Sequence, residues 1–271
     1  MTELNNTQPL KRYKILVLGD NCIDVYHYGI VDRLSPEAPV PIFTPTHQTE
    51  KPGMAANVSL NLKSFNCDVN YICDQSNSCR KTRLIDIRSK QHLLRMDTDK
   101  RAQELQVDGD LSIYDAIVIS DYNKGAITNE LILDLQERFT GPIFVDTKKT
   151  DIAKFNKCFV KINALEYSRL TSKCDELIVT RGGAGTEYKG RLYPGHKVEV
   201  TDVCGAGDTF LAALTWAYLC TKDVPLAIDF ANKCASITVQ HTGVYALTEQ
   251  DLNTLVLPSS ELDLLLNLLT N

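Results

Sequence analysis

The chain has no long hydrophobic run, which argues against a protein that spans a membrane. The longest nearly apolar stretch, Phe210 to Cys220, is too short to cross a bilayer. Met1 to Leu10 is polar and lacks the apolar core of a signal peptide. Basic blocks are also absent and the net charge is −5, so we expect neither a nucleic-acid partner nor a membrane partner.

Paired cysteines of the kind that bind zinc are missing as well. The nine cysteines are odd in number, and none belongs to a Cys-x-x-Cys pair. This pattern favours reduced thiols over a disulfide framework or a zinc site. Together with the polar N-terminus, it predicts a soluble, cytoplasmic protein.

Internal repeats, low-complexity tracts and linkers are absent, so the sequence predicts a single domain over residues 12–271. A chain of 271 residues is long enough to bury one sizeable α/β core.

Five short apolar runs are typical of buried parallel strands, and each ends in polar residues. They alternate with helical stretches such as Thr128 to Phe139, as in a parallel sheet that is covered on both faces. Such sheets bind ligands beyond the carboxyl ends of their strands, so we predict one cleft there. The alternative explanation is that these residues are polar because the strand ends emerge into water, without forming a cleft. The runs are Ile15–Leu18 before Asp20, Ala116–Ile119 before Asp121, Ile143–Val145 before Asp146, Cys158–Ile162 before Asn163, and Leu177–Val179 before Thr180.

Two segments, residues 22–48 and 81–97, alternate between apolar and polar residues. The first is rich in proline, and proline inside a strand implies an edge strand or an isolated ribbon. We therefore expect strands that lie outside the main sheet.

The stretch Thr201 to Thr209 predicts a tight turn that opens a helix. Gly205 and Gly207 lack a Cβ, so the backbone can turn sharply and approach a ligand. The unpaired N–H groups and the dipole of the first helical turn suit a phosphate or a developing oxyanion. The acid that follows, Asp208, either stabilises the start of the helix or accepts a proton from a hydroxyl nucleophile.

This stretch resembles the second signature of the ribokinase-like (PfkB) carbohydrate kinases. Other pieces occur in the family's order: Gly19-Asp20, Pro52-Gly53-Met54-Ala55-Ala56-Asn57, Asn163-Ala164-Leu165-Glu166 and Thr180 to Gly185. Two departures are Cys204, where relatives usually have Thr, and Met54, where they have a second glycine. The resemblance implies a three-layer α/β/α sandwich with a mostly parallel sheet and a small β-lid, formed by the two alternating segments.

The resemblance also implies roles for particular residues, with ATP and Mg²⁺ as cofactors. Asp208 would be the catalytic base, and Gly205, Ala206 and Gly207 would form the anion hole. The residues expected to bind the sugar are Asp20, Gly53, Asn57 and Asp121. Those expected near the nucleotide are Asn163, Thr180, Arg181, Gly183, Gly185 and Asn232, while Glu166 would act on Mg²⁺ through water.

Within that family, the chain resembles the kinase half of bacterial bifunctional heptose 7-phosphate kinase/adenylyltransferases. Asp32 to Pro41, Ser120 to Ala126 and Asp146 to Lys148 carry this similarity. Two regions look shortened, one after Asp74 and one after Glu166. The first would lack a helix and a strand, which should leave an apolar strip at the sheet edge. We therefore expect a homodimer in which the lid segments meet.

The implied reaction is transfer of phosphate from ATP to the anomeric hydroxyl of a heptose 7-phosphate, giving the 1,7-bisphosphate. The substrate's own phosphate requires a cation, and Arg33, Arg88 and Lys124 are candidates, although each could be a solvated surface charge. Two alternatives remain open: a kinase of another sugar or sugar phosphate, and a non-catalytic relative that binds a sugar or a nucleotide.

Overall fold

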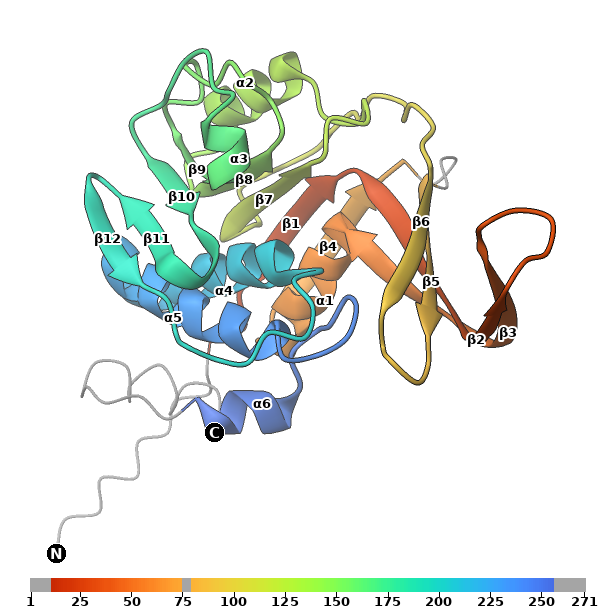
Figure 1. Cartoon of the computed structure of the whole chain (residues 1–271). Coiled ribbons are helices and arrows are strands. Elements are labelled where there is room, and N and C mark those ends of the chain that lie inside the picture. Colours follow the sequence, from red (N-terminus) through yellow and green to blue (C-terminus); the bar gives the residue numbers. More distant parts are fainter. Residues whose placement is uncertain (1–10, 75–78, 256–271) are drawn as a thin grey trace, which may run out of the picture.

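The computed structural model describes residues 11–74 and 79–255, which form two β-sheets and the helices that cover the larger one (Figure 1). The strands are β1 (Lys14–Gly19), β2 (Asn21–Leu34), β3 (Pro41–Met54), β4 (Asp68–Cys73), β5 (Cys79–Asp86), β6 (His92–Thr98), β7 (Ala116–Asp121), β8 (Ile143–Thr147), β9 (Cys158–Asn163), β10 (Leu177–Thr180), β11 (Gly185–Tyr188) and β12 (Arg191–Pro194). The helices are α1 (Ala55–Ser64), α2 (Asn129–Arg138), α3 (Ala164–Tyr167), α4 (Ala206–Thr221), α5 (Val224–Thr238) and α6 (Glu249–Thr254).

The larger sheet has eight strands in the order β12-β11-β10-β9-β8-β7-β1-β4. The pairs from β10 to β4 are all parallel, and only β11 and β12 run antiparallel. The five predicted apolar runs are β1, β7, β8, β9 and β10, so their polar carboxyl ends meet at one edge, as predicted. None of the described helices is long and apolar enough to cross a membrane.

Helices cover both faces of this sheet. In Figure 1, α1, α4 and α5 lie on one face and α2 and α3 on the other. The predicted stripe of α2 is buried at Leu131, Ile132 and Leu135, and Thr128 caps the helix by accepting a hydrogen bond from Leu131 N. The expected three-layer α/β/α sandwich is confirmed.

The smaller sheet contains four strands in the order β3-β2-β5-β6, and β2 follows directly from β1. Its strands come from the two alternating segments of the sequence. The proline-bearing strand β3 is an edge strand, as the prolines predicted. Figure 1 shows the β2–β3 hairpin projecting away from the body, so this sheet is the β-lid of the predicted fold.

The shortened region after Asp74 leads from β4 to β5 across residues 75–78, with no helix among the described residues there. Among the described residues, β4 has no large apolar side chain that is fully exposed, so the expected apolar strip is not found there and this prediction is wrong for that part of the chain. The side chain of Ile72 in β4 packs against a core cluster that includes Ala102 and Leu105 of the irregular segment before β7. That segment covers the face that would otherwise be bare. Large apolar side chains are exposed on the lid instead, at Leu34, Val40, Ile87, Leu94 and Met96.

Candidate active site

The N-terminus of α4 lies at the carboxyl edge of the central sheet and organises the candidate site. Gly205 precedes the helix with φ of +78°, in the left-handed region that glycine adopts without strain. A Cβ on Gly205 would lie 2.9 Å from Asn57 Nδ2, and one on Gly207 would lie 2.8 Å from Lys161 Nζ. Gly205 therefore requires glycine for its backbone conformation, and the side chains of Asn57 and Lys161 approach the turn closely.

The N–H groups of this turn are partly free to bind an anion. Ala206 N donates to Val203 O at 3.3 Å, so this N–H group is turned away from the anion hole in which the sequence placed it. The N–H groups of Gly205, Gly207 and Asp208 donate to no acceptor within the described part of the chain. These three groups, at the positive end of the helix dipole, are available to bind an anion and are the candidate anion hole.

Asp208 lies in the first turn of α4, and its side chain is only 3% exposed. Its Oδ1 accepts a hydrogen bond from the Tyr122 hydroxyl at 3.0 Å, and its Oδ2 accepts one from Asn57 Nδ2 at 2.9 Å. It does not cap the helix, since the N-cap residue is Gly205. The alternative in which Asp208 only stabilises the helix start therefore does not account for its partners, which come from two other elements.

The surroundings of Asp208 raise its pKa to about 6. Burial contributes most, because a carboxylate loses solvation there, and the nearby Asp146 carboxylate adds to it. The hydrogen bonds from Asn57 and Tyr122 and the charge of Lys161 act in the opposite direction. A carboxylate with this pKa is ionised at neutral pH, yet it holds a proton more strongly than an exposed Asp, as a general base requires.

Two lysines from neighbouring strand ends bring positive charge to the anion hole. Lys161 Nζ forms a buried ion pair with Asp146 Oδ2 at 2.7 Å, and each side chain is only 5% exposed. Lys148 forms an ion pair with Glu166. The buried Asp146 Oδ1 has no hydrogen-bond partner among the described residues. It is an oxygen that a water or a hydrated cation could use.

Asn163 and Glu166 form a capping box at the start of α3. Asn163 Oδ1 accepts from Glu166 N at 2.9 Å, and Glu166 Oε2 accepts from Asn163 N at 2.7 Å. With both carboxylate oxygens already engaged by Asn163 N and Lys148, Glu166 suits a metal ion that is held through water. This donor set fits Mg²⁺, which prefers oxygen ligands and keeps several waters. The described residues contain no group of three or more His, Cys, Asp and Glu that could hold a metal directly.

A cavity of about 390 Å³ beside the anion hole has the size of a small-ligand site. It shares Gly207 with a second cavity of about 460 Å³ that contains Asp208 and the two lysines. Of the residues predicted near the nucleotide, Asn163 lines the second cavity and Arg181 lines neither, since it pairs with Glu187. The others line the first cavity: Thr180, Gly183, Gly185 and Asn232.

Several residues predicted to bind sugar have structural partners instead. Asp20 is 1% exposed and accepts hydrogen bonds from the backbone N–H groups of Tyr122, Lys124 and Ala126. Asp121, also 1% exposed, accepts from the Thr147 hydroxyl. These contacts show that Asp20 and Asp121 fix the loop after β7. Asn57 donates to Asp208, and a Cβ on Gly53 would lie 2.0 Å from Asp24 Oδ2, so Gly53 makes room for that acid.

Met54 occupies a position that suits glycine. Its φ is +55°, a region that favours glycine, and its side chain is 2% exposed. The backbone there keeps the glycine-like geometry of the family motif, and the buried side chain packs with Cys22 and Cys79.

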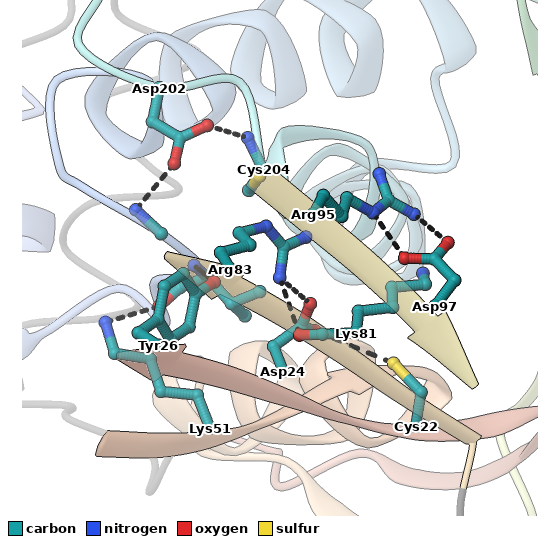
Figure 2. Close-up of polar contacts among 12 residues, drawn as sticks. Cys22, Asp24, Tyr26, Lys51, Lys81, Arg83, Arg95, Asp97, Asp202 and Cys204 are labelled. Atoms are coloured by element: carbon teal, nitrogen blue, oxygen red, sulfur yellow. Dashed lines mark hydrogen bonds and ion pairs between the residues drawn. The ribbon is translucent and has the colours of Figure 1, made fainter. Parts of the chain in front are cut away.

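Sequence reasoning missed the inner face of the lid, which Figure 2 shows opposite the turn that contains Asp202 and Cys204. Asp24 on β2 forms a buried ion pair with Arg83 on β5 at 2.5 Å. Arg95 on β6 lies directly opposite Arg83 and pairs with Asp97. Lys81 Nζ forms no ion pair with a described residue and lies 5.0 Å from the centroid of the Tyr122 ring. The alternation of β2, β5 and β6 was visible in the sequence, but it did not reveal which face points inward.

The predicted phosphate-binding cations lie elsewhere. Arg33 is exposed and lies nine residues beyond Asp24 on β2, or roughly 30 Å away at about 3.3 Å per residue. Arg88 pairs with Asp32, and both side chains are exposed. Lys124 pairs with Asp99 at 2.5 Å. Arg88 and Lys124 are thus engaged by acids, whereas Lys81 is separated from Asp208 by the Tyr122 side chain.

The candidate site thus combines a buried acid beside a helix N-terminus with two lysines at the same cavity, at the carboxyl edge of a parallel sheet. Residues 160–251 match the model of the pfkB family carbohydrate kinases. Over these residues the chain is similar to that family.

Two curated relatives are similar over most of the chain. The bifunctional protein HldE of Hydrogenovibrio crunogenus is 28% identical over 91% of this chain and 63% of its own length. HldE of Marinomonas sp. is 30% identical over 91% of this chain and 64% of its own length. The chain thus spans less than two thirds of these relatives. The first alignment covers 307 residues, more than the 271 of this chain, so that relative has segments that are missing here, as the shortened regions predicted.

Among solved structures, the ribokinase of Arabidopsis thaliana, in complex with ribose and ATP, superposes with a TM-score of 0.64. It is 16% identical, and the match covers 86% of this chain and 95% of that chain. This similarity supports the ribokinase-like fold.

Proposed function

We propose that this chain is an ATP-dependent sugar kinase that acts in the cytoplasm. The observation that supports this proposal most directly is the place of Asp208, a buried carboxylate held between Tyr122 and Asn57 at the edge of the candidate anion hole. Asp208 would accept the proton of the sugar hydroxyl as its oxygen attacks the γ-phosphorus. The N–H groups of Gly205 and Gly207, with Lys161, would stabilise charge on the transferred phosphoryl group.

The cofactors follow from the two connected cavities. ATP would place its base in the cavity with Asn232 and Gly185, and its phosphates in the cavity with Lys148 and Lys161. Mg²⁺ would be held through water by Glu166 and would neutralise phosphate charge when bound. The ribokinase of Arabidopsis thaliana, which binds ribose and ATP, supports this arrangement by its fold.

We further propose that the acceptor is a sugar phosphate, and specifically a heptose 7-phosphate phosphorylated on its anomeric hydroxyl in the pathway to the ADP-heptose of lipopolysaccharide. The sequence resemblance of Asp32 to Pro41 and of Ser120 to Ala126 supports this substrate. So do the HldE relatives, and so do the basic side chains Lys81 and Arg95 of the lid, of which Lys81 lies 5.0 Å from the ring of the tyrosine that donates to Asp208. A sugar of six or seven carbons with a terminal phosphate is longer than the tyrosine that separates Lys81 from Asp208, so it could reach both.

The two alternatives predict different behaviour. A kinase of an unphosphorylated sugar would not need the cation Lys81. A non-catalytic relative would not need the base, and the intact arrangement of Asp208, Lys161 and Glu166 argues against it. Coupled measurement of ADP release over a panel of sugars and sugar phosphates tests the proposal. Turnover of heptose 7-phosphate far above the other compounds is expected, and no ADP release with any sugar would contradict it.

The role of Lys81 can be tested by Lys81→Met, which keeps the aliphatic stem and removes the charge. A contact to a charged group contributes about 1.5–3 kcal/mol, or roughly ten- to a hundredfold in kcat/KM. We expect this loss for the sugar phosphate, carried by KM, while KM for ATP stays unchanged and the unphosphorylated sugar loses only the few-fold expected from the cation–π contact with Tyr122.

Arg33→Met is the matched control, since Arg33 is a lid cation that lies far from the base along β2. It should leave KM for the sugar phosphate unchanged in a single chain. If Arg33→Met raised KM for the sugar phosphate more than Lys81→Met does, the phosphate would bind near Arg33 and not near Lys81.

We also propose that two copies associate through their lids. Leu34, Val40, Leu94 and Met96 are each about half exposed or more on the lid, and a patch of this kind is normally covered. Light scattering at tens of micromolar protein should give a dimer mass, and Leu94→Lys/Met96→Lys should shift it to a monomer. A monomer mass for the unaltered chain would contradict this proposal.

A further inference from the structure

The loop after β7 brings a tyrosine to the base from a distant part of the chain. Tyr122 N donates to Asp20 Oδ2 at 2.7 Å, and the Lys124 and Ala126 N–H groups also donate to the Asp20 carboxylate. Asp20 lies at the end of β1, with only 1% of its surface exposed. This buried carboxylate therefore fixes the backbone at Tyr122 and over the residues that follow it.

The Tyr122 hydroxyl is a hydrogen-bond donor toward Asp208. Burial and the nearby Asp208 carboxylate raise the pKa of Tyr122 well above its ordinary value, so the phenol keeps its proton. An ionised carboxylate can only accept, which fixes the direction of this 3.0 Å hydrogen bond. Since Asn57 donates to the other oxygen, the plane of the Asp208 carboxylate is set from both sides.

The ring of Tyr122 lies between the lid and the phosphate cavity. Lys81 from the lid and Lys148 from the end of β8 each place an ammonium 5.0 Å from its centroid. Cation–π contacts of this kind restrict the ring and hold the hydroxyl in place. The tyrosine is thus fixed at its backbone, at its ring and at its hydroxyl.

We propose that Tyr122 is a positioning residue that orients the Asp208 carboxylate for proton transfer. This inference rests on the proposed role of Asp208 as the base. The sequence resemblance gave Tyr122 no role. Correct orientation of a base over a hydroxyl contributes strongly to the rate, because proton transfer requires a narrow geometry.

The charged and hydrogen-bonding groups that face Asp208 come from five elements. They are Asn57 of α1, Tyr122 after β7, Asp146 of β8, Lys148 after β8, and Lys161 of β9. Tyr122 and Asn57 are the two that hydrogen-bond to the carboxylate. Loss of the Tyr122 donor should therefore make Asp208 easier to protonate, while the other groups stay as they are.

The test is Tyr122→Phe, which removes one oxygen and keeps the ring. We expect kcat on the pH plateau to fall by about tenfold, and the acidic limb of the kcat profile to move upward by about one pH unit. Tyr114→Phe is the matched control, because Tyr114 also has a hydrogen-bonded hydroxyl, accepting from Asn70 away from the site. Its profile should coincide with that of the wild type.

A second measurement does not depend on turnover. The ¹³C resonance of the Asp208 carboxyl, assigned by its loss in Asp208→Asn, should titrate about one pH unit higher in Tyr122→Phe than in the wild type. If the acidic limb of the kcat profile and the ¹³C titration of Tyr122→Phe both coincide with those of the wild type, Tyr122 does not position the base. If the wild type turns over no sugar but the ¹³C titration still shifts, the proposed kinase function fails while the Tyr122–Asp208 coupling stands.

Discussion

Asp208→Asn should lower kcat by about 10²–10⁴-fold, since loss of a general base typically has this effect. The amide keeps the shape of the carboxylate and its place between Tyr122 and Asn57, but it cannot accept the proton of the sugar hydroxyl. ATP binding should be roughly retained, because the cavity that would hold the nucleotide base does not include Asp208.

Steady-state kinetics and an ATP-binding isotherm on the same preparation check this result. Asp134→Asn is a suitable control, because Asp134 lies on α2 and pairs with the exposed Arg138. If Asp208→Asn turned over within a few-fold of the wild type, another group would have to be the base.

Lys161→Met should destabilise the fold by about 3–5 kcal/mol, the range seen when one partner of a buried ion pair is removed. Lys161 and Asp146 are both almost fully buried, so the substitution leaves the Asp146 charge without its cation. The same change removes the positive charge next to Gly207 and should lower kcat as well.

Urea unfolding measures the change in stability. Lys189→Met breaks an exposed pair with Glu176 and should leave the free energy of unfolding nearly unchanged. Adding Asp146→Asn to Lys161→Met should recover part of the loss, because it removes the unpaired charge. A loss below 1 kcal/mol for Lys161→Met alone would mean that the pair is solvated and not buried.

The sequence predicted the scaffold well, because the scaffold depends on local patterns. Apolar runs that end in polar residues became β1 and β7 to β10, and the glycines before Phe210 became the start of α4. The prolines of β3 marked an edge strand. Each of these features is set by neighbouring residues and can be read from a short window.

The sugar side was predicted less well, because there the chemistry depends on contacts between distant segments. Asp20 and Asp24 are both acids near the start of β2, and nothing local shows that Asp20 accepts backbone N–H groups from a loop about 100 residues later. Asp24 on the inner face of the lid was missed. A lid strand has polar residues on both faces, so alternation alone does not show which face is inward.

Lys161 and Tyr122 were missed for a related reason. A lysine inside the apolar strand β9 gives no sign that it will be paired with Asp146 on β8, since that depends on strand order. Tyr122 follows a strand end and has no motif spacing to Asp208. Only the parallel packing of β7, β8 and β9 brings these side chains to α4.

The central claim is that this chain transfers phosphate from ATP to a sugar phosphate. It is tested most directly by ³¹P NMR of the chain with ATP, Mg²⁺ and heptose 7-phosphate. The account predicts that ATP signals are replaced by those of ADP, while a second sugar phosphorus appears with coupling to the anomeric proton. Inorganic phosphate as the only new signal, or unchanged ATP, would contradict it.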